Sequence, residues 1–311
     1  MRIVFMGTPD FAVESLKVLV ENNYQVVGVI TMPDKPAGRG HKIQFSPVKQ
    51  YALDKGLKIL QPEKLKDDNF LEDLRQLQAD LQVVVAFRML PEVVWNMPRY
   101  GTFNLHASLL PQYRGAAPIN YAIINGEKET GATTFFLTHE IDTGEIILQE
   151  KIAISETDTA GTVHDKLMVM GAGMVRRTID LLIDGKTDAI DQQQFIYSDT
   201  VLKSAPKIFK ETCEVNATES VENIYNFVRG LSPYPTARID VELPNVTENI
   251  QLKVFETHKE ITSHNLPLGT TVTDSKTYLK VAVSNGFIHL ESIQAPGKKR
   301  MTTSEFLRGL R

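Results

Sequence analysis

Residues 1–90 alternate short apolar segments with stretches of helical periodicity, and this alternation restricts the folds open to the chain. The apolar segments at 2–6, 25–31 and 81–86 have the composition of strands that are covered on both faces. Helices are predicted between them, near 47–55 and 69–77. Because parallel strands need long crossover connections, this order predicts a doubly wound, mostly parallel α/β sheet.

Ligands bind such sheets beyond the carboxyl ends of the strands, so the loops after Gly7, Thr31 and Ala86 are candidate site segments. Thr8 is expected to cap a helix that has Pro9 at its first position. The segment from Gly7 lacks the G-x-G-x-x-G pattern, and no Walker A sequence occurs in the chain. We therefore expect a Rossmann-like sheet that binds neither NAD nor a flavin dinucleotide.

The character of the sequence changes beyond about Leu182. Residues 189–206 are polar and lack a sustained period, so we expect a linker there, between domains at 1–188 and 207–311. One helix, at about 220–231, is predicted in the second domain. Short strands with turn residues between them predict a small antiparallel β-barrel of the OB-like kind, with strands near 237–243, 251–256, 269–272, 278–283 and 287–293.

Composition narrows the class of protein further. Hydrophobic residues make up 42% and charged residues 23% of the 311 positions, the balance of a soluble globular protein. Cys213 is the only cysteine, which argues against a disulfide framework and a Cys-rich zinc site, so no metal is expected. No apolar run is long enough for a signal peptide or a membrane span. We expect a cytoplasmic monomer with no membrane partner.

The formal net charge of −4 opposes binding of a polyanion, but the basic residues are unevenly distributed. Residues 34–49 contain Lys35, Arg39, Lys42 and Lys49, and the tail at 297–311 is also basic. Salt screens charges beyond about 8 Å, so a local basic patch can bind a polyanion on an acidic protein. Solvated loops explain the same pattern, and the residues alone leave both possibilities open.

The segment from Gly101 to Pro111 carries the clearest chemical signal. If 102–106 is a strand, Asn104 and His106 point to the face opposite that of Phe103 and Leu105. Asp142 follows a further predicted strand and lies in a turn marked by Gly144. An amide donor, an imidazole and an orienting carboxylate are the groups needed for addition to a carbonyl. Asn104 and His106 could instead be hydrogen-bonded polar residues of the core.

Several longer motifs accompany these three residues. Together they resemble the methionyl-tRNA formyltransferase family, and the resemblance runs from the first strand to the last basic turn. The Asn/His/Asp set and the S-L-L-P loop are shared by folate-dependent formyltransferases. The segments at 7–11, 33–40 and 294–299 resemble those of the tRNA enzymes in particular. The segments are 7–11 (GTPDF), 33–40 (PDKPAGRG), 104–106 (NLH), 108–119 (SLLPQYRGAAPI), 142–144 (DTG) and 294–299 (QAPGKK).

The resemblance implies a binding site for 10-formyltetrahydrofolate as co-substrate. Its residues would come from the S-L-L-P loop and from the loop after residue 86, which in the family lines the pterin pocket through its backbone. The family commonly has Ala-Tyr-Gly there, whereas this chain has A-F-R-M-L-P at 86–91, which is shorter and lacks the glycine. The implied folate residues are Ser108, Leu109, Leu110, Pro111, Phe87 and Met89.

The resemblance also implies the acceptor, initiator Met-tRNA, whose methionine α-amine would receive the formyl group for translation initiation. Arg39 and Lys42 would approach the acceptor end, and the second domain, with Lys298 and Lys299, would hold the stem. Catalysis would rest on Asn104, His106 and Asp142. Two alternatives remain at this stage: a formyltransferase or hydrolase with another acceptor, and a tRNA-binding module that has lost activity.

Overall fold

The computed structural model describes residues 1–37, 42–244, 246 and 248–310, and in it the chain divides into two units. The first unit comprises Met1–Gly115, Gly131–Ile152 and His164–Lys203. The second comprises Ala116–Thr130, Ala153–Val163 and Ser204–Arg311. No helix in the described part of the chain is long and apolar enough to cross a membrane.

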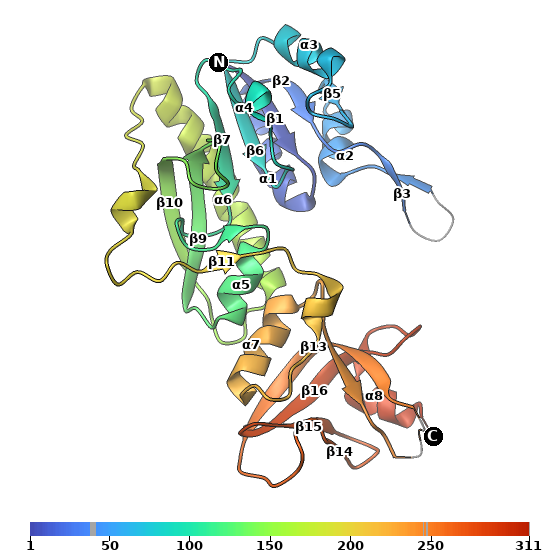
Figure 1. Ribbon diagram of the computed structural model, residues 1–311. Coiled ribbons are helices and arrows are strands. Elements are labelled where there is room, and N and C mark those ends of the chain that lie inside the picture. The colour runs from blue at the N-terminus through green and yellow to red at the C-terminus, as the bar shows by residue number, and fades with distance from the viewer. Residues whose placement is uncertain (38–41, 245, 247, 311) are drawn as a thin grey trace. The chain divides into compact units, whose positions relative to one another are not determined.

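The first unit is built on a seven-stranded sheet (Figure 1). Its five strands from β7 to β5 pair in parallel, whereas β9 runs antiparallel to β7, which confirms the predicted mostly parallel sheet. In spatial order the strands are β10 (Ile146–Ala153), β9 (Glu129–Phe136), β7 (Thr102–His106), β6 (Leu81–Val85), β1 (Arg2–Gly7), β2 (Gln25–Ile30) and β5 (Ile59–Leu60).

Side-chain alternation divides the sheet into two faces. Val4 and Met6 of β1 and Val84 of β6 pack in one core cluster with α3 (Asp68–Gln76) and α4 (Glu92–Trp95), and Val84 pairs with Asn104 in β7. Leu105 points to the opposite face and approaches Gly171 of α6 (Ala160–Asp184). The other helices around this sheet are α1 (Asp10–Glu21), α2 (Pro47–Asp54) and η1 (Gln192–Phe195).

Two local features differ from the sequence prediction. Helix α1 begins at Asp10, with Pro9 in the N-cap position and no side-chain cap from Thr8; instead, the Asp10 carboxylate accepts a hydrogen bond from the Phe11 amide at 2.9 Å. A short hairpin of β3 (Lys35–Ala37) and β4 (Lys42–Gln44) lies in the predicted basic loop. The remaining short strands are β8 (Arg114–Gly115) in the first unit and β11 (Ser204–Ala205) in the second.

The second unit has a curled antiparallel sheet around its own core, close to the predicted strands. Asn120 donates to the Gly230 carbonyl at 2.7 Å and links α5 to α7 within this unit. The strands, in spatial order, are β12 (Ala237–Val241), β13 (Ile250–Ile261), β16 (Gly286–Gln294), β15 (Leu279–Val283) and β14 (Thr271–Thr273), with β17 (Met301–Thr302) beside β16. The helices are α5 (Pro118–Ile124), η2 (Lys210–Cys213), α7 (Val221–Leu231) and α8 (Thr303–Arg308).

Gly131 of β9 leaves no room for a side chain. A Cβ there would lie 2.0 Å from the Glu150 carbonyl oxygen and 2.5 Å from Leu109, whereas a Cβ at Gly173 in α6 would meet nothing within 4 Å. We expect Gly131→Ala to destabilise the first unit by about 1–3 kcal/mol through overpacking. Gly173→Ala should leave its stability unchanged or raise it by up to about 1 kcal/mol.

Trp95, the only tryptophan, lies in the first unit, so its fluorescence during urea unfolding can measure both variants. Equal urea midpoints for the two variants would contradict the close approach of β9 to β10.

Candidate active site

Strand β7 places Asn104 and His106 on the same face of the sheet, as the alternation predicts. The His106 side chain is buried, with 7% of its surface exposed. Its Nε2 lies 2.9 Å from the Tyr113 carbonyl oxygen. A carbonyl can only accept a hydrogen bond, so Nε2 must carry a proton. In the neutral imidazole, Nδ1 therefore holds the lone pair and is the atom available to take up a proton.

Asp142 lies beside that nitrogen. Its Oδ2 is 3.9 Å from His106 Nδ1, and the carboxylate is only 13% exposed. The same oxygen accepts a hydrogen bond from the Gly115 amide at 2.9 Å. A separation of 3.9 Å is longer than a hydrogen bond, so the carboxylate acts on the imidazole through its charge. A proton arriving at Nδ1 would make an imidazolium that this charge stabilises.

The third predicted residue, Asn104, differs from its neighbours in the strand. It is partly exposed, whereas Phe103 and Leu105 are buried. Among the residues that the structure describes, the Asn104 side-chain amide has no hydrogen-bond partner. Polar groups on a central strand are normally paired within the protein, so this free amide favours a ligand contact over a purely structural role.

The S-L-L-P loop that follows β7 is held by a network of hydrogen bonds. Ser108 donates to the Gln112 carbonyl at 2.6 Å, and Thr133 donates to the Ser108 carbonyl at 2.7 Å. Gln149 donates to the Leu110 carbonyl at 2.9 Å. Ser108, Leu110 and Pro111 are buried, and Leu109 is partly exposed. Of the four predicted folate residues here, Leu109 is therefore the one whose side chain is open to a ligand.

The loop after β6 contains the other two predicted folate residues. Phe87 is partly buried against the cluster of α3 and α4, whereas the Met89 side chain is 75% exposed. Between them, Arg88 donates to the carbonyls of Pro62 and Glu63, and burial lowers its guanidinium pKa. The loop is thus tied to the chain that follows β5. Because β6 pairs with β7, it ends at the same edge of the sheet as Asn104 and His106.

The predicted tRNA residues belong to both units. Arg39 lies outside the described residues, and Lys42 begins β4 in the first unit. Lys298 and Lys299 are exposed in the turn between β16 and β17 in the second unit. Lys49, by contrast, donates to Asp34 at 2.5 Å, and this hydrogen bond, together with one from Gln61, lowers the pKa of the Asp34 carboxyl.

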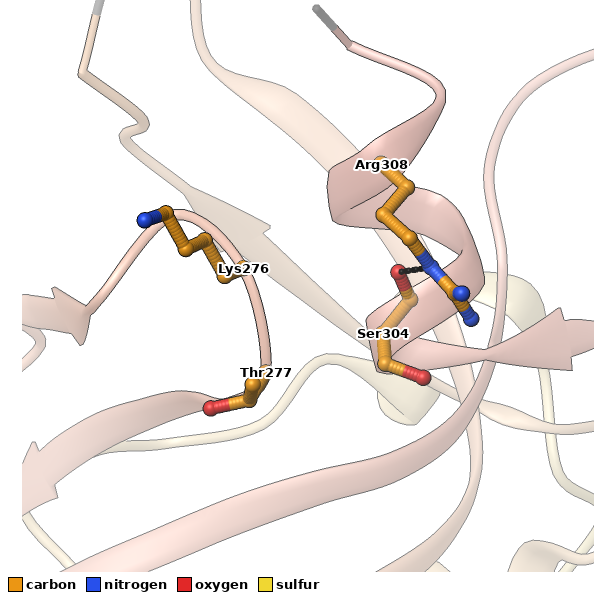
Figure 2. A pocket seen from close by; sticks show the side chains of 4 residues that line it. All are labelled: Lys276, Thr277, Ser304 and Arg308. Atoms are coloured by element: carbon orange, nitrogen blue, oxygen red, sulfur yellow. Dashed lines mark hydrogen bonds between the residues drawn. The ribbon is translucent and has the colours of Figure 1, made fainter.

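The second unit also has an open pocket of about 400 Å³, which is not among the predicted sites. Figure 2 shows the four side chains that line it, Lys276 and Thr277 from the turn before β15 and Ser304 and Arg308 from α8. The Arg308 guanidinium donates to the Ser304 carbonyl at 3.1 Å. Two cationic groups and two hydroxyls suit an anion such as a phosphate.

One residue that positions the site was missed in the sequence. Gln192 in η1 is 1% exposed and donates to the carbonyls of Asp142 at 2.9 Å and Gly144 at 2.8 Å. The Gln192 side-chain oxygen, Oε1, accepts hydrogen bonds from Arg114 Nε at 3.1 Å and Nη2 at 2.6 Å. It therefore ties the Asp142 loop to the segment that carries Gly115. The Gln-rich stretch around it has no periodicity, so no sequence signal marked this role.

Residues 1–178 match the formyl transferase family, and residues 207–311 match the formyl transferase C-terminal domain. Methionyl-tRNA formyltransferase from Parabacteroides distasonis is 62% identical over 312 residues, covering 100% of this chain and 96% of that protein. The protein of the same name from Bacteroides thetaiotaomicron is 60% identical over 311 residues, with coverage of 100% and 96%.

Solved structures agree with the fold. WlaRD, a sugar 3N-formyl transferase determined in the presence of dTDP and 5-N-formyl-THF, superposes with a TM-score of 0.65. The alignment covers 96% of this chain and 99% of that one at 19% identity. This likeness confirms the predicted fold class, an α/β sheet followed by an antiparallel β domain.

Gln192→Ala should loosen the Asp142 loop. The change removes the hydrogen bonds to two carbonyls and leaves the Arg114 guanidinium without its partner in η1. Each lost hydrogen bond to a buried group costs about 1–3 kcal/mol. We expect faster amide hydrogen exchange in 142–146 and a lower urea midpoint by Trp95 fluorescence. Gln193→Ala, at an exposed neighbouring position, is the matched control. Identical exchange in both variants would show that the loop does not depend on Gln192.

Proposed function

Because the chain belongs to the methionyl-tRNA formyltransferase family, we propose that it transfers the formyl group of 10-formyltetrahydrofolate to the methionine α-amine of initiator Met-tRNA. The observation that carries the proposal for the site is the Asn104 side-chain amide, unpaired among the described residues, on the same face of β7 as His106, whose Nδ1 lies 3.9 Å from Asp142. In the reaction, the amine nitrogen bonds to the formyl carbon, and the bond from that carbon to the folate nitrogen breaks.

Asn104 would act on the formyl oxygen. The donor supplies an electrophilic carbonyl, and negative charge develops on its oxygen as the amine adds. The Asn104 amide N–H can donate a hydrogen bond to that oxygen without first breaking a hydrogen bond within the described protein. Preorganised donors of this kind stabilise the transition state more than the ground state. The Asn104 amide is therefore suited to stabilise the oxygen of a formyl group.

His106 would move the proton. The attacking amine must lose a proton, and the folate nitrogen must gain one as it leaves. Nε2 already donates to Tyr113, so Nδ1 is the atom that accepts the proton and then returns it. The Asp142 charge at 3.9 Å stabilises the imidazolium between these two events. The amine is itself a competent nucleophile, so no covalent enzyme intermediate is needed.

The tRNA would be held by exposed basic side chains. Lys298 and Lys299 and the basic pocket of Lys276 and Arg308 are suited to phosphate contacts. Arg39 and Lys42 would approach the acceptor end, as the resemblance implies. The enzyme would act on charged tRNA in the cytoplasm, as a monomer.

The function and the site can be tested in one assay, formyl transfer from 10-formyltetrahydrofolate to initiator Met-tRNA, with elongator Met-tRNA for comparison. We expect the initiator to be preferred. His106→Gln should lower kcat/KM by roughly 10²–10⁴ and Asn104→Ala by roughly 10²–10³. The control His139→Gln changes a 72% exposed histidine and should retain wild-type activity. No transfer by the wild type would refute the function, and active His106 and Asn104 variants would refute the site alone.

The tRNA surface predicts a change in salt dependence. Replacing both Lys298 and Lys299 by Ala should remove up to two phosphate contacts and so flatten the slope of log affinity against log salt by about 1–2. Folate binding should not change. Lys166→Ala, a lysine of α6 in the first unit, is the control. A slope equal to that of the wild type would exclude the turn at 298–299 from the tRNA interface.

A further inference from the structure

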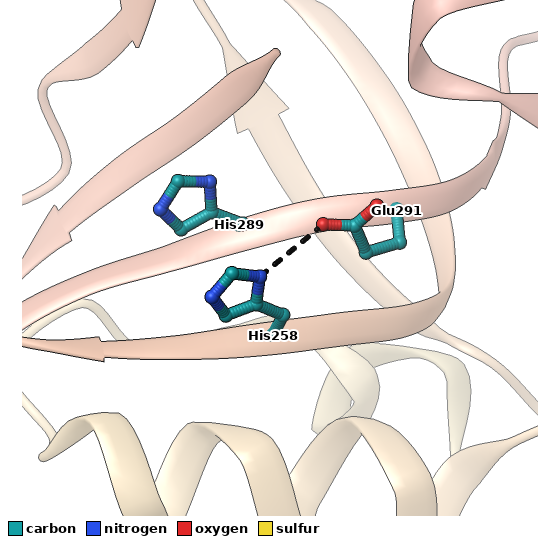
Figure 3. Close-up of side chains that lie close together, drawn as sticks. All are labelled: His258, His289 and Glu291. Atoms are coloured by element: carbon teal, nitrogen blue, oxygen red, sulfur yellow. Dashed lines mark ion pairs between the residues drawn. The ribbon is translucent and has the colours of Figure 1, made fainter.

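The second unit carries a cluster of metal-ligating side chains that formyl transfer does not use. Across the β13–β16 ladder, His258 pairs directly with His289, and Glu291 follows two residues later in β16. One ligand atom from each of these three residues lies within 4.8 Å of the other two. Figure 3 shows the three side chains on the neighbouring strands, with a nitrogen of His258 turned toward the Glu291 carboxylate.

The two imidazoles lie against each other. Their rings stack at 4.6 Å between centroids, with 10° between planes. His258 Nδ1 is 3.6 Å from a Glu291 carboxylate oxygen. Parallel rings direct their lone pairs in parallel, so a cation shared with this carboxylate needs a side-chain rotation, which the exposed His258 allows.

A second carboxylate fixes the proton of His289. Glu260 Oε2 lies 2.5 Å from His289 Nε2, and because a carboxylate accepts, Nε2 is the protonated nitrogen. This leaves the Nδ1 lone pair for a cation. Lys280 donates to the same oxygen at 2.7 Å. The Glu260 carboxylate is thus held between His289 and the nearest lysine. A carboxylate behind a ligating histidine is the usual outer-shell arrangement of protein metal sites.

We propose that His258, His289 and Glu291 form a binding site for a Zn²⁺-class divalent ion, supported by Glu260 behind His289. Two imidazole nitrogens and one carboxylate oxygen suit Zn²⁺, whereas Mg²⁺ prefers oxygen ligands alone. Zinc–nitrogen bonds of about 2.0–2.1 Å place tetrahedral ligand atoms about 3.3 Å apart. The cluster must therefore close by on the order of 1 Å, which the exposed side chains of His258 and Glu291 allow. The fourth position remains for water or a further ligand.

Metal binding can be measured on the 311-residue chain by calorimetric titration with Zn²⁺ and by the visible absorption of bound Co²⁺. We expect one equivalent bound by the wild type. Glu260→Gln should weaken binding by roughly 10–100-fold. His258→Gln and His289→Gln should weaken it more, because each removes a ligand. The matched control is His139→Gln, which removes a histidine that has a carboxylate 3.5 Å away but belongs to no three-ligand group among the described residues.

Several outcomes would overturn the proposal. These are no Zn²⁺ binding by the wild type, unchanged affinity in both the His258 and His289 variants, and displacement of Zn²⁺ by equimolar Mg²⁺. His258 is exposed, so its replacement should not affect folding, and circular dichroism of each variant checks this. If His258→Gln loses Zn²⁺ binding while its circular dichroism spectrum is unchanged, the result supports a ligand role for His258 rather than a packing role.

Discussion

The hydrogen bond from His106 Nε2 to the Tyr113 carbonyl decides which chemistry the end of β7 can perform. It fixes the proton on one ring nitrogen and, in the neutral ring, leaves the lone pair on the other, next to Asp142. Tyr113 adopts a positive φ of 60° and Asp142 one of 55°, so two left-handed residues shape the loops around the ring. The Gly115 amide then holds the Asp142 carboxylate, and Gln192 holds its backbone carbonyl.

The sequence predicted the parts of this site that depend on local periodicity. Alternation along 102–106 placed Asn104 and His106 on one face, because a strand has a period of two whatever it packs against. The buried strands of the first unit were predicted from continuous apolar runs, and the short strands of the second unit from apolar runs separated by turn residues. Helix α1 lies where the sequence predicted it, but the predicted cap was wrong. Pro9 occupies the N-cap position that Thr8 was expected to fill.

What the sequence could not supply depends on contacts between distant segments. Gln192 reaches the loop of Asp142, 50 positions away, through its side chain alone. Strand β10 has no alternating pattern that marks it, and Ile190 pairs with Ile146 in a stretch that reads as polar linker. Ser108, Leu110 and Pro111 are buried, and only the family resemblance pointed to them as folate residues.

Each unit contains a histidine whose ring is held by a hydrogen bond from Nε2. In each, a fixed acceptor receives a hydrogen bond from the Nε2–H of a histidine and leaves the lone pair on Nδ1: the Tyr113 carbonyl for His106, and Glu260 for His289. What surrounds Nδ1 then decides its role. At His106 a single carboxylate lies 3.9 Å away in a buried site, which suits the transient charge of a transferred proton. At His289 a second imidazole and a carboxylate share a partly open site, and three converging donors suit a metal ion rather than a proton.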